Sequence, residues 1–254
     1  HYMDVYIPST TSSGYTIKKS GNFRPQKNKE IFYRKPAFYL SLPYQQEKTV
    51  YIRIKSEAAI SLALRILSPN VFIEKVSVEK FLLGIFYGIL AIMVFYNIFL
   101  SLRLYDKNFL YLALFIGFGI LMLLFYDSII QLLISEKLIE FNRIGLPIFL
   151  VLTMYFLLKF TDSFMPLRGG AFLIKKMGTG LQILWLLAMI IVPFSSYMAS
   201  VQSLIPLALL TLLFSAYRAL VCKHAQNHVN KYVYIAWVLL MLGIGGVILT
   251  RLGL

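Results

Sequence analysis

The chain divides into a strand-like first part and a longer part made of apolar runs. Residues 49–55 and 60–68 alternate apolar and polar side chains with the period of two that a half-buried strand requires. Two shorter strands and two turn-rich stretches precede them: strands at 5–7 and 37–42, turns at 8–14 and 18–29. Residues 1–75 are therefore predicted to form an antiparallel, jelly-roll-like β-sandwich, incomplete because four or five strands make a thin core.

Six apolar runs follow, each close to the ~20 residues that a helix needs to cross a hydrocarbon core. They are 81–102, 109–126, 144–160, 181–197, 204–221 and 232–249. Leu, Ile, Val and Phe dominate the first run, and at about −0.3 to −0.6 kcal/mol each they favour its insertion by about −4 to −8 kcal/mol. Residues 76–254 are predicted to form a polytopic helical bundle, which makes the chain a mainly α membrane protein.

The basic residues of the loops predict the orientation of this bundle. With the amino terminus outside, the inner loops hold nine basic residues: Arg103, Lys107, Lys159, Arg168, Lys175, Lys176, Arg218, Lys223 and Lys231. The outer side holds three: Lys137, Arg143 and Arg251. Cytoplasmic loops carry the excess of Lys and Arg, so the first domain is expected outside a cytoplasmic (inner) membrane. The outer loop 127–143 has the apolar spacing of an amphipathic helix lying in the interface.

Composition agrees with lipid as the main partner. The chain is 59% hydrophobic and 14% charged, against about 45–50% and about 25% in soluble domains. Residues 1–80 nevertheless carry 19 of the 36 charged side chains, which indicates two regions in two solvents. The net charge of +14 is spread along the outer domain and short loops, so no nucleic acid partner is expected.

Few residues suggest chemistry within the spans. Charged side chains at the middle of a span mark ion or proton pathways, and none is predicted there. Four charged residues are interpreted as anchors at span ends, where they can reach water: Asp106, Asp127, Lys159 and Asp162. Asn97, beside Tyr96, is expected to find a hydrogen-bonding partner on a neighbouring helix, with a ligand or signalling role as the alternative. Gly84 and Gly88 form a small-residue face that permits close helix approach, including a homodimer.

Metal and catalytic sites are not favoured. Three possible metal ligands lie in the loop before the last run: Cys222, His224 and His228. Without a second cluster they are interpreted as incidental, and no cofactor is expected. Cys222 is the only cysteine, so no internal disulfide can form. Catalytic triads, zinc-protease motifs and phosphate-binding loops are missing from the sequence, so we do not expect an enzyme in these residues.

The order of these parts resembles the bacterial seven-transmembrane receptors with diverse intracellular signalling modules (7TM-DISM). FYLSLP, TVYIRIKS and LALRILSPNVF are similar to the closing strands of the family's extracellular sandwich, and GIFYGILAIMVFYNIFLSLRLYDKNFLYLALF to its first two spans. FTDSFMPLR is similar to the exit from the third span. The candidate signalling or structural residues are Gly84, Gly88, Tyr96, Asn97, Arg103, Asp106, Tyr111 and Trp237.

The resemblance implies a receptor. It implies a sandwich that senses an extracytoplasmic, carbohydrate-like ligand, a coupling segment at 68–80, a seventh span, and a cytoplasmic output domain in cis. That domain would be a histidine kinase, nucleotide cyclase, diguanylate cyclase or phosphatase, and we expect the chain to be a fragment without it. The alternative is a transporter or permease subunit, which would be expected to carry polar sites within its spans.

Overall fold

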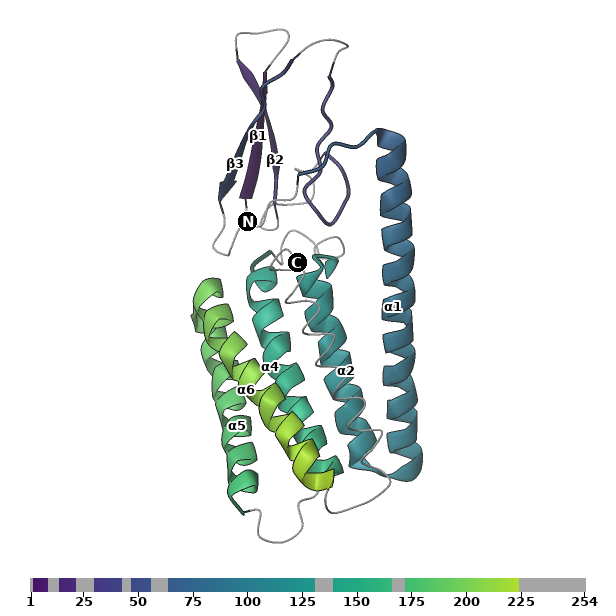
Figure 1. Cartoon of the computed structure of the whole chain (residues 1–254), viewed down its shortest axis with the longest axis vertical. Coiled ribbons are helices and arrows are strands. Elements are labelled where there is room, and N and C mark those ends of the chain that lie inside the picture. Colours follow the sequence, from purple (N-terminus) through teal and green to yellow (C-terminus); the bar gives the residue numbers. More distant parts are fainter. Residues whose placement is uncertain are drawn as a thin grey trace.

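The computed structural model describes residues 2–8, 14–21, 30–42, 47–55, 64–130, 139–165 and 172–223. Three strands, β1 (Tyr2–Pro8), β2 (Tyr15–Ser20) and β3 (Tyr51–Lys55), lie at one end of the molecule. The helices below them are α1 (Pro69–Leu104), α2 (Lys107–Tyr126), α4 (Ile139–Phe164), α5 (Phe172–Ile191), the 3₁₀ turn η3 (Val192–Phe194) and α6 (Tyr197–Lys223). The protein is thus a small sheet domain above a bundle of long helices (Figure 1).

The sheet is antiparallel with the order β2-β1-β3. Val5 of β1 stands opposite Lys18 and Ile52, and this face of the sheet contains the buried Val5 and Ser20. On the other face Tyr6 stands opposite Ile17 and Tyr51. Side chains alternate between the two faces of a strand, so the sheet has one covered and one exposed face.

The strand predictions have mixed outcomes. The strand expected at 5–7 is confirmed as part of β1, and the strand expected at 49–55 is confirmed over Tyr51–Lys55. β2 was missed, because its sequence YTIKKS is mostly polar and pairs through its backbone with β1. The prediction of a strand at 37–42 is wrong. The strand predicted at 60–68 is also wrong over its described part, 64–68. Both segments alternate apolar and polar side chains but pair with no other strand. Residues 60–63 lie outside the described residues.

Helix α1 continues from the outer domain through the membrane without a break. Pro69 occupies the first turn, where its missing N–H is not needed, and Phe72 N donates to Ser68 O at 2.9 Å. Its 36 residues rise about 54 Å, well beyond a ~30 Å hydrocarbon core. The expected coupling segment 68–80 is therefore the first part of α1, which rises above the ends of the other helices (Figure 1).

Five helices of the described residues are long and apolar enough to cross a membrane. The sixth expected span, 232–249, lies outside the described residues. Helix α5 begins at Phe172, earlier than the apolar run 181–197, because a helix can include Lys175 and Lys176 at its inner end. It ends at Ile191 and continues into η3, because the backbone nitrogen of Pro193 carries no hydrogen and cannot extend the helical hydrogen bonds. Of the loop 127–143, residues 131–138 lie outside the described residues, and the last five begin α4.

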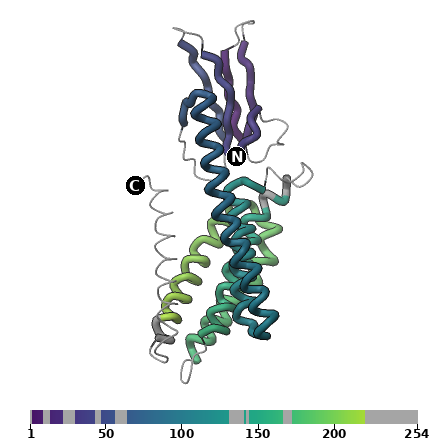
Figure 2. The backbone as a smooth tube through the Cα atoms, turned by 90° about the vertical axis from the view of Figure 1, so that its right-hand side faces the viewer, coloured from purple at the N-terminus to yellow at the C-terminus, as the bar shows by residue number. Residues whose placement is uncertain are grey.

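Helices α4, α5 and α6 enclose the main core. Trp185 has no exposed surface and donates from Nε1 to Thr211 Oγ1 at 2.9 Å, linking α5 to α6. Val151 and Leu158 of α4 and Phe214 of α6 belong to the same buried cluster. Helix α1, in contrast, buries only Asn97 among its 36 residues, and it contacts the bundle along α2. The bundle therefore has a well-packed half and a peripheral first helix, which lies at one side of the bundle in Figure 1 and in front of the other helices in Figure 2.

The orientation of the bundle agrees with the loop charges. α1 ends at the side of the bundle away from the sheet, and α2 begins there (Figure 1). Arg103 lies in the last turn of α1, Lys107 begins α2, and Lys175 and Lys176 lie near the start of α5. These basic residues share the inner end, which places the sheet domain outside.

The turn between α1 and α2 contains a strained residue. Tyr105 has φ 54°, a left-handed conformation that suits glycine, and its side chain is 93% exposed. We expect Tyr105→Gly to raise the free energy of unfolding by about 0.5–1 kcal/mol, because the backbone strain is relieved and little contact is lost. Reversible unfolding in mixed micelles would measure this. Leu102→Gly, inside the helix, should lower stability by about 1 kcal/mol; equal effects of the two variants would contradict the explanation.

Candidate functional site

Three consecutive residues of the outer domain converge on one carboxylate of α1. The Tyr33 hydroxyl donates to Glu79 Oε2, and Arg34 Nη2 forms an ion pair with Glu79 Oε1. Lys35 Nζ lies 3.5 Å from the same oxygen. Tyr33 is also held edge-to-face against Phe72 of α1, with ring centroids 5.5 Å apart. The outer domain is thus bound to the part of α1 just before its apolar run.

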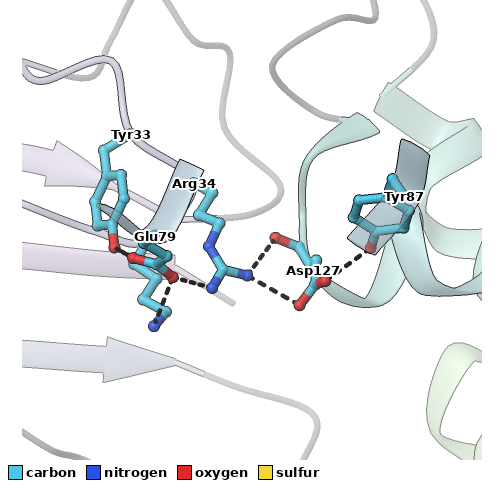
Figure 3. A network of polar contacts seen from close by, with 6 residues as sticks. Tyr33, Arg34, Glu79, Tyr87 and Asp127 are labelled. Carbon is cyan, nitrogen blue, oxygen red and sulfur yellow. Dashed lines mark hydrogen bonds and ion pairs between the residues drawn. The ribbon is translucent and has the colours of Figure 1, made fainter. Parts of the chain in front are cut away.

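Arg34 also reaches the end of α2. Its Nη1 donates to Asp127 Oδ1 at 2.9 Å, and Tyr87 of α1 donates from its hydroxyl to Asp127 Oδ2 at 2.8 Å. Figure 3 shows the guanidinium between the two carboxylates. We refer to Tyr33, Arg34, Glu79, Tyr87 and Asp127 as the Arg34 junction. It joins three parts of the molecule: the outer domain, α1 and the α2 terminus.

The local structure at the end of α2 explains where Asp127 points. Ile129 N donates to Leu124 O at 3.0 Å and Ser128 N to Phe125 O at 3.1 Å, with Ser128 at φ 59°. These two bonds form a Schellman motif, which ends a helix and satisfies its last carbonyls. A carboxylate is unfavourable at the negative end of a helix dipole. The positive charge of Arg34 offsets this at Asp127 and makes the contact between the two parts specific.

The electrostatics of the Arg34 junction keep its donors protonated. Burial, followed by the hydrogen bond and negative charge of Glu79, raises the pKa of Tyr33 to about 12. Burial lowers the pKa of Arg34, but its hydrogen bonds and charge interactions with Glu79 and Asp127 outweigh this and raise the pKa above the ordinary value. The stabilisation by neutral Tyr33 is present below pH 10 and is lost as the pH rises towards 12. The contacts therefore persist at physiological pH.

The sheet is connected to the Arg34 junction through residues 30–42. Lys18 Nζ, on β2, lies 2.7 Å from Glu30 Oε1 and donates to Tyr39 O at 2.8 Å. Tyr39 N donates to Glu30 Oε2 at 3.1 Å. Since Lys18 shares its face of the sheet with Val5, this segment lies on the covered face. β2 thus contacts directly the segment that carries Tyr33 and Arg34.

A second polar cluster lies near the inner end of the bundle. Arg218 of α6, only 2% exposed, forms an ion pair with Asp162 of α4, and Gln182 of α5 donates to the other oxygen of that carboxylate. Arg218 Nη2 also donates to Met165 O at 3.0 Å. Gly178 of α5 lies beside this carboxylate, and a Cβ at this position would make an ordinary van der Waals contact of 3.5 Å with Asp162 Oδ1. We call Asp162, Gln182 and Arg218 the inner cluster; it ties together α4, α5 and α6.

The residues expected from the sequence are only partly brought together. Gly84 lines the space beside the Arg34 junction, and a Cβ added at Gly84 or at Gly88 would meet no neighbouring atom within 4 Å. Tyr96 is 60% exposed. The Asn97 side chain donates to Met93 O at 2.7 Å, so the predicted partner on a neighbouring helix is wrong and the bond lies within α1.

The other expected residues lie at the inner end or elsewhere. Arg103 is exposed in the last turn of α1, and Asp106 caps α2 by accepting from Asn108 N at 2.9 Å. Tyr111 is half-buried in α2. Trp237, His224 and His228 lie outside the described residues, as does the side chain of Cys222. Within the part of the chain that is described, no group of three or more His, Cys, Asp or Glu residues could hold a metal ion.

Sequence reasoning missed both polar clusters. Asp127 and Asp162 were interpreted as anchors reaching water, but both carboxylates form ion pairs within the protein. Arg218 was counted as a loop residue, yet it is buried within the membrane-length stretch Tyr197–Ala219. Its position inside the apolar run 204–221 was the available signal, because a basic residue there needs a partner.

Comparison with known proteins agrees with this division of the chain. Residues 79–254 match the family model described as 7TM diverse intracellular signalling. Residues 1–68 match the model described as 7TMR-DISM extracellular 2. No curated protein and no solved structure matches the chain. The Arg34 junction therefore connects the two matched regions, with Tyr33 and Arg34 in the first and the other three residues in the second.

Proposed function

Because the chain belongs to the 7TM diverse intracellular signalling family, we propose that it senses a ligand outside the membrane and transmits the signal to a cytoplasmic output domain in cis. The chain is a multi-pass membrane protein with its amino-terminal domain outside. The observation that carries the proposal is the bridge from Arg34 to Glu79 and Asp127. One side chain of the outer domain thereby holds both α1 and the end of α2.

The exposed face of the sheet supports a carbohydrate-like ligand. Tyr15 and Tyr51 lie on this face, 54% and 56% exposed, with their rings edge-to-face at 5.9 Å. Tyr2, 42% exposed, shares the face through the strand register, as do the exposed Lys19 and Arg53. Aromatic rings offer apolar surfaces for stacking, while the basic groups donate hydrogen bonds. A sugar presents both apolar C–H faces and hydroxyls, so it is the ligand class that we propose.

A route for the signal follows from the contacts. Ligand on the exposed face would shift β2, and Lys18 holds the segment that contains Tyr33 and Arg34. A change there alters the contacts with Glu79 and Asp127, and so the position of α1 relative to α2. Helix α1 is continuous from Pro69 to Leu104, which allows it to carry a displacement to the inner end. The ligand must bind one arrangement better than the other for any signal to result.

Ligand binding can be tested on the chain in lipid nanodiscs with defined cello-, chito- and malto-oligosaccharides. We expect one of these series to bind, and Tyr51→Ala to weaken binding by about three- to tenfold through loss of a stacking surface. Calorimetric titration would measure this. Tyr39→Ala is the matched control, because Tyr39 is equally exposed but lies outside the sheet. Binding by none of the series, or equal effects of the two variants, would refute this ligand face.

One feature of the inner cluster supports the alternative function of a transporter. Asp162 and Arg218 are an ionic pair inside helices of membrane length, and such pairs can mark substrate pathways. Solute flux in proteoliposomes separates the two functions, because a receptor should show none. We favour the receptor, since the pair links three helices at one end of the bundle.

A further inference from the structure

A pocket lies beside the Arg34 junction, between the outer domain and the first two spans. Its volume is about 240 Å³, and its lining is almost entirely apolar. The outer domain lines it with Tyr33 and Arg34, α1 with Leu83, Gly84 and Tyr87, and the segment after α2 with Ile129. Pockets for drug-sized ligands are larger, about 300–1,000 Å³, so this one suits a part of a chain-like molecule or a small apolar group.

The pocket lies at the outer surface of the membrane. The apolar run of α1 begins at Phe81, directly after Lys80, and Leu83, Gly84 and Tyr87 fall in its first two turns. Ile129, on the opposite wall, is held by the Schellman motif at the end of α2. Tyrosine is enriched at this depth of a bilayer, where a ring can be apolar on one side and wet on the other. The molecules that most often meet this pocket are therefore membrane lipids.

The absence of a side chain at Gly84 creates part of the space. A Cβ at this position would meet no atom within 4 Å, so the wall of the pocket is open here. Gly88, one turn further into the membrane, is equally open but does not line the pocket. This face of α1 is therefore open at both glycines, and at Gly84 the opening leads into the pocket.

The rim of the pocket is positively charged. Two cations, Arg34 and Lys80, and one carboxylate, Glu79, line the pocket, and Glu79 is engaged by Arg34. Lys80 is exposed, and no carboxylate of the described residues pairs with it. A basic side chain at this level attracts anionic headgroups. The excess positive charge therefore favours an anionic lipid over a zwitterionic one.

We propose that this pocket binds an anionic phospholipid of the outer leaflet, with one acyl chain inserted between Leu83, Gly84 and Ile129 and the phosphate beside Lys80. The site goes beyond the proposed receptor function, because lipid binding here requires neither an external ligand nor an output domain. Since Tyr33 and Arg34 form its upper wall, a bound lipid also contacts the Arg34 junction directly.

Photolabelling tests the site in nanodiscs. The probe is phosphatidylglycerol with a diazirine on one acyl chain, compared with phosphatidylcholine carrying the same chain. We expect crosslinks to Leu83, Tyr87 or Ile129, stronger with phosphatidylglycerol. Gly84→Leu should abolish these crosslinks by filling the pocket, whereas Gly88→Leu, the matched control, should leave them unchanged. Lys80→Gln should reduce the preference for phosphatidylglycerol about fivefold, as expected for one basic side chain near an anionic surface.

Thermal unfolding of each variant, recorded in the same nanodiscs, ensures that lost labelling reflects the pocket rather than the fold. If Gly84→Leu labels as strongly as the wild type, the chain does not enter the pocket and the proposal is wrong. If phosphatidylcholine labels as well as phosphatidylglycerol, the headgroup assignment is wrong. Oligosaccharide binding is independent of both results, so failure here leaves the receptor proposal standing.

Discussion

Arg34→Ala is expected to separate the outer domain from the bundle and to abolish coupling between them. The Arg34 side chain is 15% exposed, and its removal leaves Glu79 and Asp127, 20% and 23% exposed, without their shared cation. The expected loss of stability is about 2 kcal/mol, less than the about 3–5 kcal/mol for breaking a fully buried ion pair, because both carboxylates retain contact with water. In the full-length receptor, ligand should still bind but no longer change output activity.

The separation can be measured by electron paramagnetic resonance. Spin labels replace Lys19 on β2 and Lys75 on α1, both exposed, after Cys222 has been changed to Ser. The distance distribution should broaden in Arg34→Ala. Arg34→Lys should behave similarly, because a single ammonium group cannot contact both carboxylates as the planar guanidinium does.

Arg53→Ala is the matched control, since it removes one positive charge from an exposed position on β3. It should leave the Lys19 to Lys75 distribution unchanged. An unchanged distribution in Arg34→Ala would show that the outer domain is held by other contacts. The coupling route through the Arg34 junction would then have to be abandoned.

The sequence predicts the large features of this fold well, because each depends on local patterns. Long apolar runs predict the membrane helices, and the excess of basic residues at the inner loops predicts their orientation. β1 and β3 follow from alternating apolar residues. β2 could not be predicted in this way, because Lys18 and Lys19 make it polar and its pairing with β1 depends on the backbone.

The Arg34 junction could not be predicted from the sequence for a different reason. Arg34 and Asp127 are 93 residues apart, and each alone looks like an ordinary surface residue beside a turn or a span. Their contact depends on the length of α1, which extends beyond the membrane and sets the level at which the outer domain meets α2. The structure shows that α1 is one continuous helix from Pro69, which sets this level. The sequence pattern suggests instead a strand up to residue 68 followed by a linker.

At the inner cluster, each of two single substitutions is expected to lower the free energy of unfolding more than the double substitution does. Asp162→Leu leaves the Arg218 side chain, which is 3% exposed, without its anion, and should lower the free energy of unfolding by about 3–5 kcal/mol because a buried charge without its partner is costly. Arg218→Met should cost less, about 1–3 kcal/mol, because Asp162 is 32% exposed and still accepts a hydrogen bond from Gln182. The double variant replaces the pair by apolar side chains of similar size and should recover most of this loss.

Fluorescence of Trp185, recorded with Trp237 changed to Phe in all four proteins, offers the measurement, because Trp185 is fully buried in the same three-helix core and hydrogen-bonded to Thr211. Reversible unfolding in mixed micelles of the four proteins completes a double-mutant cycle. Lys176→Met, which removes an exposed charge at the same end of the bundle, should change stability by less than about 0.5 kcal/mol. If the losses of the single variants simply add in the double variant, Asp162 and Arg218 do not stabilise the bundle as a pair. In that case the three inner helix ends are held together by apolar packing around Trp185, and the inner cluster has no special part in setting their arrangement.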